Sequence, residues 1–257
     1  MSPLGSSTST NRSCAVSTSV AFVDRGALFV ALSREPAALL VIDPSTGRQL
    51  PVITLATESR EDTGHAIFHS DSGAGVACAS CHPEGRDDGH AWRSQELGAR
   101  RTPSLLGTLS NTAPYHWNGE AKDLASLVRL TFESRMRGPS LPDERIDAMD
   151  GWLRALKEMP AAKPSDPASA RRGKALFEGS AHCAGCHSGA MRTNNATINV
   201  STGGSFQVPS LVGVAWRAPL LHDGSAPSVR AVLQRSHGGG PLQDQQIVDL
   251  DTYVGTF

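Results

Sequence analysis

Cys78-Ala79-Ser80-Cys81-His82 and Cys183-Ala184-Gly185-Cys186-His187 are two copies of one pattern, C-x-x-C-H, in successive parts of the chain. Further pairs of similar segments surround these motifs in the same order and at nearly constant spacing. The pairs are Gly64-His-Ala-Ile-Phe68 with Gly173-Lys-Ala-Leu-Phe177, Thr102-Pro-Ser-Leu-Leu-Gly107 with Val208-Pro-Ser-Leu-Val-Gly213, Ala113-Pro-Tyr-His-Trp-Asn-Gly119 with Ala218-Pro-Leu-Leu-His-Asp-Gly224, and segments that begin at Leu141 and Leu242. This ordered series indicates two copies of one module.

The C-x-x-C-H pattern is the attachment site of c-type haem. The two thiols add to the two vinyl groups, and the adjacent histidine lies under the iron as an axial ligand. A zinc site would use two C-x-x-C pairs together, and a redox dithiol would require a thioredoxin-like βαβ setting. We therefore predict two covalently bound haem c groups, held by Cys78, Cys81, His82, Cys183, Cys186 and His187, with His82 and His187 as iron ligands.

The ligand on the far side of each iron decides the function, because an open position allows chemistry and a locked one allows only electron transfer. His237 ends a predicted helix before three glycines that could bring its ring over the second haem. Its counterpart in the first module is Phe132, which cannot ligate iron. We predict His237 as the second distal ligand, with Met191 as the alternative and Met136 as a weaker one.

His90 is the predicted distal ligand of the first haem. It stands in Asp88-Gly-His-Ala-Trp92, shortly after His82, on a loop that could move. The alternative for both distal histidines is a merely solvated side chain.

Three further side chains are candidates for the chemistry of the first haem. Trp117 could shorten an electron-transfer gap between the haems, or simply cover a haem edge. Arg101, with Arg100, could pair with haem propionates, since arginine forks onto carboxylates; ordinary surface arginines are the alternative. Glu133 follows the helix expected to line the first haem pocket, and a carboxylate there could move protons from peroxide. A solvated glutamate at a helix end is the alternative to that role.

The composition excludes several classes of protein. Lys and Arg number 24 against 25 Asp and Glu, which gives a net charge of −1 and argues against a nucleic-acid binder. No run of about 18 apolar residues exists, so no membrane span is expected. Aromatic residues make up only 5%, while Gly and Pro number 25 and 16, so a bulky buried cofactor would supply the missing core.

The predicted fold is mainly α. Each module should contain a short helix with the Gly-x-x-[Ile/Leu]-Phe block, a C-x-x-C-H turn, a long loop, a helix at 123–132 or 228–236, and a closing amphipathic helix. Short apolar runs separated by turn signals, such as Ala27-Leu-Phe-Val-Ala-Leu32, predict a β-strand segment that resembles one propeller blade. The predicted domains are a disordered N-terminus at 1–18, the strand segment at 19–57, the N-terminal c-type haem domain at 58–160, a proline-containing linker at 161–170, and the C-terminal c-type haem domain at 171–257.

The motifs also carry a family resemblance. The order C-x-x-C-H, Gly-His-Ala-Trp, Arg-Thr-Pro-Ser-Leu, Tyr-His-Trp-Asn-Gly and Asp-Leu, in residues 78–124, resembles the N-terminal half of bacterial di-haem cytochrome c peroxidases. The second module is similar to their C-terminal half, so the resemblance covers about residues 60–257. This family includes the di-haem enzymes that mature methylamine dehydrogenase.

The resemblance implies roles for individual positions. It implies a peroxidatic N-terminal haem with its distal histidine at His90, and a tryptophan between the haems at Trp117. The C-terminal haem would be an electron-transfer centre, usually ligated by Met where this chain has His237; ligation by two histidines should lower its potential. The family also binds calcium at an Asn whose place is taken here by Thr102, which argues against the ion in this chain.

Two functions remain open from the sequence. The first is a peroxidase, in which electrons enter at the haem on His187, pass Trp117 and reach hydrogen peroxide at the haem on His82. The alternative is a non-catalytic di-haem electron-transfer cytochrome, and oxidation of another protein would use the same site. The expected partners are a small redox protein and hydrogen peroxide, with no nucleic acid, and a homodimer is left open.

Haem attachment occurs after export in bacteria, so we expect a periplasmic or cell-surface protein. The N-terminus lacks the features of a signal peptide, which suggests a mature or truncated chain. Cys14 follows Asn11-Arg-Ser13, which is not a lipobox.

Overall fold

The computed structural model describes residues 17–33, 37–56, 63–235, 237 and 240–257. The described chain forms two compact units, Met1–Glu61 and Asp62–Phe257. Residues 1–16 of the predicted disordered terminus, with Cys14, lie outside the described residues, as do Ser236, Gly238 and Gly239. None of the helices in the described part of the chain is long and apolar enough to cross a membrane.

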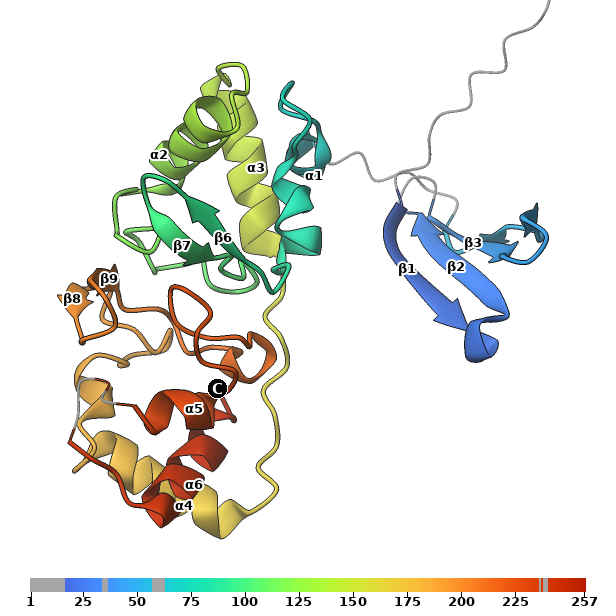
Figure 1. Cartoon of the computed structure of the whole chain (residues 1–257). Helices are drawn as coiled ribbons and strands as arrows, with labels where there is room; N and C mark the ends of the chain where they lie inside the picture. The colour runs from blue at the N-terminus through green and yellow to red at the C-terminus, as the bar shows by residue number, and fades with distance from the viewer. Residues whose placement is uncertain (1–16, 34–36, 57–62, 236, 238–239) are drawn as a thin grey trace, which may run out of the picture. The chain divides into compact units, whose positions relative to one another are not determined.

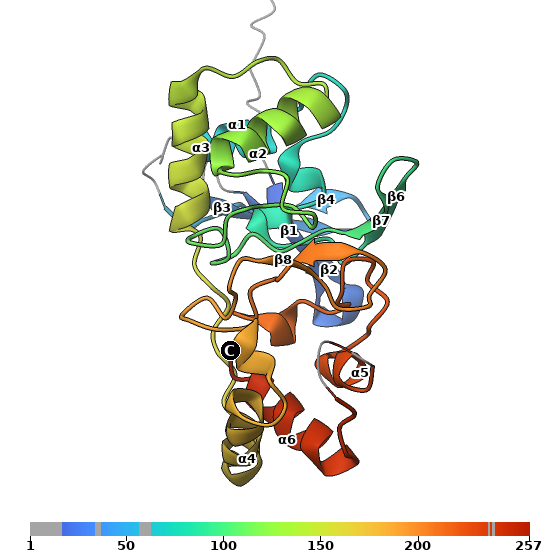
Figure 2. The same ribbon diagram turned by 90° about the vertical axis from the view of Figure 1, so that its left-hand side faces the viewer.

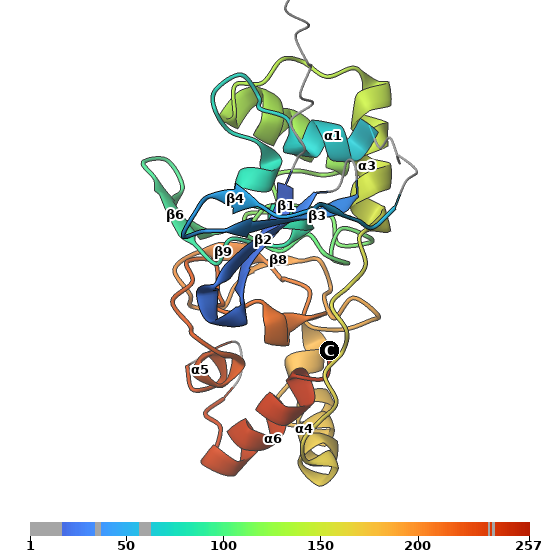
Figure 3. The ribbon, with the colours of Figure 1, turned by 90° about the vertical axis from the view of Figure 1, so that its right-hand side faces the viewer.

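The first unit is an antiparallel sheet, shown in Figures 1 and 3. The strand order is β1-β2-β3-β4, and β5 also pairs with β3. The strands are β1 (Ser17–Val23), β2 (Leu28–Ser33), β3 (Ala38–Asp43), β4 (Arg48–Gln49) and β5 (Ile53–Thr54). Within this unit, Phe22 pairs with Phe29, and Phe22, Ile53 and Leu55 are exposed apolar residues. The predicted strands are present, and the likeness to a propeller blade stays a prediction.

The second unit contains two hydrophobic cores, one for each copy of the repeat. Figure 2 shows helices α1, α2 and α3 together, away from α4, α5 and α6. The elements around the first core are α1 (Thr63–His69), the 3-10 turns η2 (Cys78–Ser80) and η3 (Pro83–Gly85), β6 (Ala91–Ser94), β7 (Gly98–Arg101), α2 (Leu124–Val128), the π-helix η4 (Arg129–Arg135) and α3 (Asp143–Ala155). Those around the second are α4 (Pro167–Glu178), η5 (Cys183–Gly185), β8 (Thr197–Asn199), β9 (Ser205–Gln207), η6 (Val214–Trp216), α5 (Val229–Leu233) and α6 (Asp244–Val254).

The helices match the repeat, but the loops after the C-x-x-C-H turns differ from the expectation. Each long loop contains a two-stranded hairpin, β6-β7 in the first copy and β8-β9 in the second. Among the residues that the structure describes, helices account for 33% and strands for 17%, so helix is the larger share without being a majority. The strand content is therefore higher than the repeat alone predicts.

The Gly-x-x-[Ile/Leu]-Phe block is explained by how its helix crosses the closing helix. A Cβ atom added at Gly64 would overlap the backbone carbonyl oxygen of Ala148 in α3. A Cβ atom added at Gly173 would overlap the backbone carbonyl oxygen of Asp249 in α6. Only glycine allows backbones to approach this closely. Phe68 and Phe177, four residues later, are both buried in the adjacent cores.

The α4-α6 crossing is also held by a buried carboxylate. Asp249 accepts hydrogen bonds from the Ser169 hydroxyl at 2.7 Å and from the Arg172 guanidinium at 2.8 and 2.7 Å. The Arg172 hydrogen bonds, followed by the one from Ser169, hold the pKa of Asp249 well below its usual range. The carboxylate therefore stays ionised and paired at neutral pH.

We expect Gly173→Ala to lower the free energy of unfolding by about 1–3 kcal/mol, because the added methyl group overpacks the crossing. Gly151→Ala is the matched control, since a Cβ there meets nothing within 4 Å. It should raise the free energy of unfolding by about 0.5–1 kcal/mol through helix propensity. Denaturant unfolding, followed by circular dichroism, measures both. Equal effects at the two sites would contradict this explanation of the repeat.

Candidate functional site

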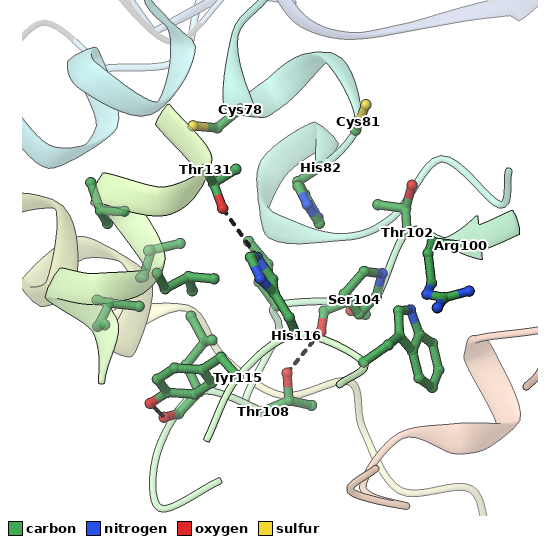
Figure 4. Close-up of a pocket in the computed structure, with 18 of the residues that line it drawn as sticks. Cys78, Cys81, His82, Arg100, Thr102, Ser104, Thr108, Tyr115, His116 and Thr131 are labelled. Carbon is green, nitrogen blue, oxygen red and sulfur yellow. Dashed lines mark hydrogen bonds between the residues drawn. The ribbon is translucent and has the colours of Figure 1, made fainter. Parts of the chain in front are cut away.

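Each C-x-x-C-H motif lines its own cavity. The first cavity has a volume of about 440 Å³ and is lined by Cys78, Cys81 and His82 (Figure 4). The second has a volume of about 220 Å³ and contains Cys183, Cys186 and His187 in its lining. Because the two cysteine pairs line different cavities, the geometry gives no support to a single four-cysteine zinc site.

The proximal histidines are oriented as metal ligands usually are. The Nδ1 atom of His82 lies 3.2 Å from the carbonyl oxygen of Arg86, and that of His187 lies 3.1 Å from the carbonyl oxygen of Arg192. A carbonyl only accepts, so Nδ1 donates and the lone pair remains on Nε2, the arrangement typical of metal-bound histidine. Burial lowers the pKa of both rings, to about 4 for His187, which favours the neutral form that binds metals.

The cysteines are placed in surroundings that disfavour thiolates. Burial raises the pKa of Cys78 to about 11 and also raises the pKa values of Cys81 and Cys183. Zinc binding and thiol redox chemistry both use the thiolate form. In the absence of a bound metal, burial therefore favours the thiol form of Cys78, Cys81 and Cys183.

Two arginines, Arg101, which is buried, and Arg217, which is half-buried, lie in the part of the lining that the cavities share. Arg101 is 4% exposed, pairs with Asp87 at 2.7 Å and donates to the Arg217 carbonyl oxygen at 2.6 Å. Burial, together with the charge of Arg101, lowers the pKa of Arg217 to about 10. Among the described residues, neither the Nε atom of Arg101 nor that of Arg217 has a hydrogen-bond partner.

This surplus of buried positive charge fits haem. The guanidinium group of arginine binds carboxylates through two parallel hydrogen bonds. Burying a charge costs free energy unless the charge is paired. Haem propionates are carboxylates, and Arg101 and Arg217 line both cavities, so they are the residues that could pair with propionates of a haem in either one. The predicted role of Arg101 is thus compatible with its position, and Arg217 is a second candidate that the sequence did not reveal.

The second cavity brings the predicted distal ligand opposite the proximal one. The rings of His187 and His237 are separated by 6.4 Å between centroids and inclined by 19°. This separation is too long for direct ring stacking, and it leaves room for one metal ion with imidazole nitrogens at about 2 Å on each side. Met191, the alternative ligand, is absent from the lining of this cavity.

The first cavity contains a histidine that the sequence analysis did not select. Figure 4 shows that His116 and His82 both project into this cavity. The Nδ1 atom of His116 lies 2.8 Å from Glu120 Oε1, and its Nε2 lies 3.1 Å from the Thr131 hydroxyl. Arg135 holds the same Glu120 oxygen at 2.6 Å. Nδ1 also lies 3.1 Å from an Arg135 guanidinium nitrogen, so it stands between a carboxylate that only accepts and a guanidinium that only donates, while Nε2 faces a hydroxyl that can do either.

The electrostatics keep this histidine neutral and its partner ionised. Burial lowers the pKa of His116, and the hydrogen bond with Glu120 offsets this only in part. For Glu120, burial would raise the pKa, but hydrogen bonds from Arg135 and His116 outweigh it and lower the pKa. A neutral imidazole with an ionised carboxylate behind it is suited to accepting a proton at Nε2.

His90 and Glu133, which the sequence analysis assigned to catalysis, are not in the lining of the first cavity. His90 is exposed, and its ring makes an edge contact with Trp92 at 5.9 Å between centroids. The Glu133 carboxylate instead accepts from the Leu141 backbone N–H at 3.0 Å, where the chain leads into α3. Phe132, in contrast, does line the cavity, as its alignment with His237 predicts.

Trp117 lines both cavities. Its indole N–H donates to the Arg101 carbonyl oxygen at 2.7 Å, and its ring makes an edge contact with His222 at 6.5 Å between centroids. These contacts fix the orientation of the indole in the shared lining.

A comparison of the two copies of the repeat distinguishes His116 as a candidate functional residue. His116 corresponds to Leu221, and both residues have positive φ angles, 65° and 70°. A polar residue at a position where the other copy has an apolar one marks a difference in function rather than in fold.

No protein-family model matches the chain. The methylamine utilization protein MauG of Methylorubrum extorquens is 27% identical, over 72% of this chain and 70% of its own length. Among solved structures, a hydrazine synthase of Kuenenia stuttgartiensis is similar with a TM-score of 0.64 and 17% identity, covering 78% of this chain and 89% of that chain. A MauG-like protein associated with microbial copper homeostasis gives 0.56 and 17%, with coverages of 77% and 89%. The diheme peroxidase BthA of Burkholderia thailandensis gives 0.53 and 14%, with 76% and 84%.

We expect His237→Ala to convert the iron of the second cavity from low-spin to high-spin in the haem-loaded protein, because the ring opposite His187 is lost. Electron paramagnetic resonance and carbon monoxide binding measure the change. Met191→Leu is the control and should leave both signals as in the wild type. The reverse pattern would make Met191 the ligand.

Proposed function

Because the chain is related to the bacterial di-haem cytochrome c peroxidases, we propose that it is a di-haem c-type cytochrome that reduces hydrogen peroxide. Peroxide would react at the first cavity with electrons relayed from the second. The observation that carries the proposal is the unequal lining of the two cavities around a shared tryptophan. Bound haem would supply the coordination position for peroxide and would pass on electrons from an external donor, and the chain supplies the groups described below.

The residues that would hold the two haems are those of the C-x-x-C-H motifs. Cys78 and Cys81 would form the thioether bonds in the first cavity, as would Cys183 and Cys186 in the second. His82 and His187 each present Nε2 for the iron, because Nδ1 is engaged by a backbone carbonyl. The guanidinium groups of Arg101 and Arg217 would pair with propionates. In bacteria this attachment occurs after export, so we infer a periplasmic or cell-surface location.

The two cavities differ on the side opposite the proximal histidine. In the second, His237 faces His187 across a gap suited to a metal, so this centre is closed to substrate. In the first, the aligned position is Phe132, a buried apolar side chain that offers no ligand. The first cavity is therefore the place for peroxide.

His116 is the residue best placed to move the proton. In the tautomer that donates from Nδ1 to Glu120, its Nε2 lone pair would accept a proton from peroxide and return it to the departing oxygen. Glu120 would stabilise the imidazolium that forms, and Arg135 keeps Glu120 ionised. This assignment places in His116 and Glu120 the role that the sequence suggested for Glu133.

Trp117 is the proposed relay between the cavities. It is the one aromatic side chain that lines both of them among the described residues. Its hydrogen bond to Arg101 and its contact with His222 hold the indole in place, so its position does not depend on a loop movement. A small redox protein would donate the electrons that enter at the second haem.

A non-catalytic electron-transfer cytochrome is the second candidate. It is favoured by one observation: His116 projects into the same cavity as His82 and could itself occupy the iron, closing the first centre as His237 closes the second. The spin state of the first haem separates the two functions. A high-spin signal, or one that appears on reduction, supports the peroxidase, and two permanently low-spin irons support the carrier.

We expect Trp117→Phe to lower steady-state peroxide turnover by about tenfold or more, because the relay loses its indole. A single turnover at the first site, measured by stopped-flow absorbance with no donor present, should stay close to that of the wild type. Unchanged steady-state turnover would reject Trp117 as the relay.

We expect His116→Gln to lower kcat/KM for peroxide by about 10²–10⁴-fold, the usual contribution of a general base. Wild-type activity should fall as pH decreases through the lowered pKa of His116, because protonation removes the base. The variant should not show this fall in activity at low pH. His90→Gln is the control and should retain the activity and its pH profile. A loss confined to His90→Gln would return the role to His90.

A further inference from the structure

A second cluster of metal-ligating side chains lies outside the lining of both cavities. It consists of His65 and His69 of α1 and Glu84 of η3, and the ligand atoms of the three residues all lie within 4.8 Å of one another. The two histidines are four residues apart, which places them on one face of the helix. Their rings are stacked, with centroids 3.9 Å apart.

The hydrogen bonds of His69 favour a positive charge, either a proton or a metal ion, between its ring and Glu84. Its Nδ1 lies 2.9 Å from the His65 carbonyl oxygen, which can only accept, so Nδ1 carries a proton. Its Nε2 then faces Glu84 Oε1 at 3.1 Å. If Nε2 is unprotonated, two lone pairs face each other across this contact. Either a second proton or a metal ion between the two atoms resolves the conflict.

The surroundings favour the metal over an ordinary surface ion pair. His65 is 8% exposed, and the side chains of His69 and Glu84 are 13% and 34% exposed. The Trp152 ring packs edge-on against both imidazoles, at 5.4 and 5.9 Å between centroids, and limits their rotation. Glu84 is the most exposed of the three side chains.

The donor set selects the class of ion. Two imidazoles and one carboxylate are the protein ligands of several zinc sites, in which a water completes the tetrahedron. Calcium and magnesium prefer oxygen ligands throughout. We propose that His65, His69 and Glu84 bind a divalent transition-metal ion, with Zn²⁺ as the ion best matched to the site.

The second copy of the repeat shows that these ligands are specific to the first. Lys174 and Glu178 occupy the positions of His65 and His69, and they form an exposed pair at 3.8 Å. Gly189 stands at the position of Glu84. The fold alone therefore does not require imidazoles on this helix face.

The site would join α1 to the turn that carries the first proximal histidine. Glu84 belongs to η3, which begins directly after His82, and its φ of 51° is unusual for a side-chain-bearing residue. A metal ion bound by Glu84 and the two α1 histidines would fix this turn and, through it, the backbone of His82. The inference does not depend on peroxidase activity, because it concerns binding of the ion itself.

The test uses the full, haem-loaded chain after removal of loosely bound metal with a chelator. Titration with Zn²⁺, followed calorimetrically and by metal analysis of the dialysed protein, should give one zinc per chain beyond the haem iron. His69→Gln and Glu84→Gln should each weaken this binding by about 100-fold or more, since loss of an outer partner alone typically costs 10–100-fold. His90→Gln, which removes an exposed histidine elsewhere, should bind as the wild type does.

Glu84→Gln keeps the shape of the side chain and a hydrogen-bonding oxygen, so it guards against a folding defect in the other variant. Zinc-edge X-ray absorption should show only nitrogen and oxygen ligands at about 2.0–2.1 Å. The proposal would be overturned by any of three results: no stoichiometric zinc, an unchanged zinc affinity in both cluster variants, or sulfur ligands at about 2.3 Å from the zinc. A chain that binds zinc in this way but lacks peroxide turnover would reject the proposed function and retain the metal site.

Discussion

The arrangement of the two cavities depends on the hydrogen bonds that one buried residue, Arg101, makes to both copies of the repeat. Its side chain joins Asp87 of the first repeat to the Arg217 carbonyl of the second, while its own backbone N–H donates to His222 and its carbonyl accepts from Trp117. One residue thus connects both copies of the repeat through side chain and backbone together. Because these contacts lie in the lining that the cavities share, the distance between the two centres is set by protein packing.

The repeat made much of the second unit predictable. Gly64 and Gly173 occupy equivalent positions in the two copies of the repeat. Each lies where two helices cross and where a Cβ atom has no room. The C-x-x-C-H motifs were equally informative, because the chemistry needs all three residues at a fixed spacing, and the structure gives each motif its own cavity. The sequence singled out His237 because its counterpart Phe132 cannot ligate a metal, and the ring of His237 lies 6.4 Å from that of His187 between centroids.

Residues whose role depends on long-range packing were harder to predict. His116 enters the first cavity because its φ of 65° turns the loop inward and Thr131 of η4 receives the ring, and neither fact is visible in a local pattern. Glu133 stands one residue from the cavity-lining Phe132, but neighbouring residues of a helix point in different directions, and its carboxylate is engaged by Leu141. The β6-β7 and β8-β9 hairpins lack the strongly alternating apolar pattern that would have identified them as strands.

The like charges of Arg101 and Arg217 have a consequence for the docking of the two repeats. The Arg101 guanidinium is buried and paired with Asp87, Arg217 is half-buried, and each has an Nε atom without a hydrogen-bond partner among the described residues. Bringing two positive charges together beside a single carboxylate costs free energy through both repulsion and lost hydration. A further anion bound in the shared lining would lower this cost, so we expect the two halves of the second unit to dock more tightly once such an anion is bound.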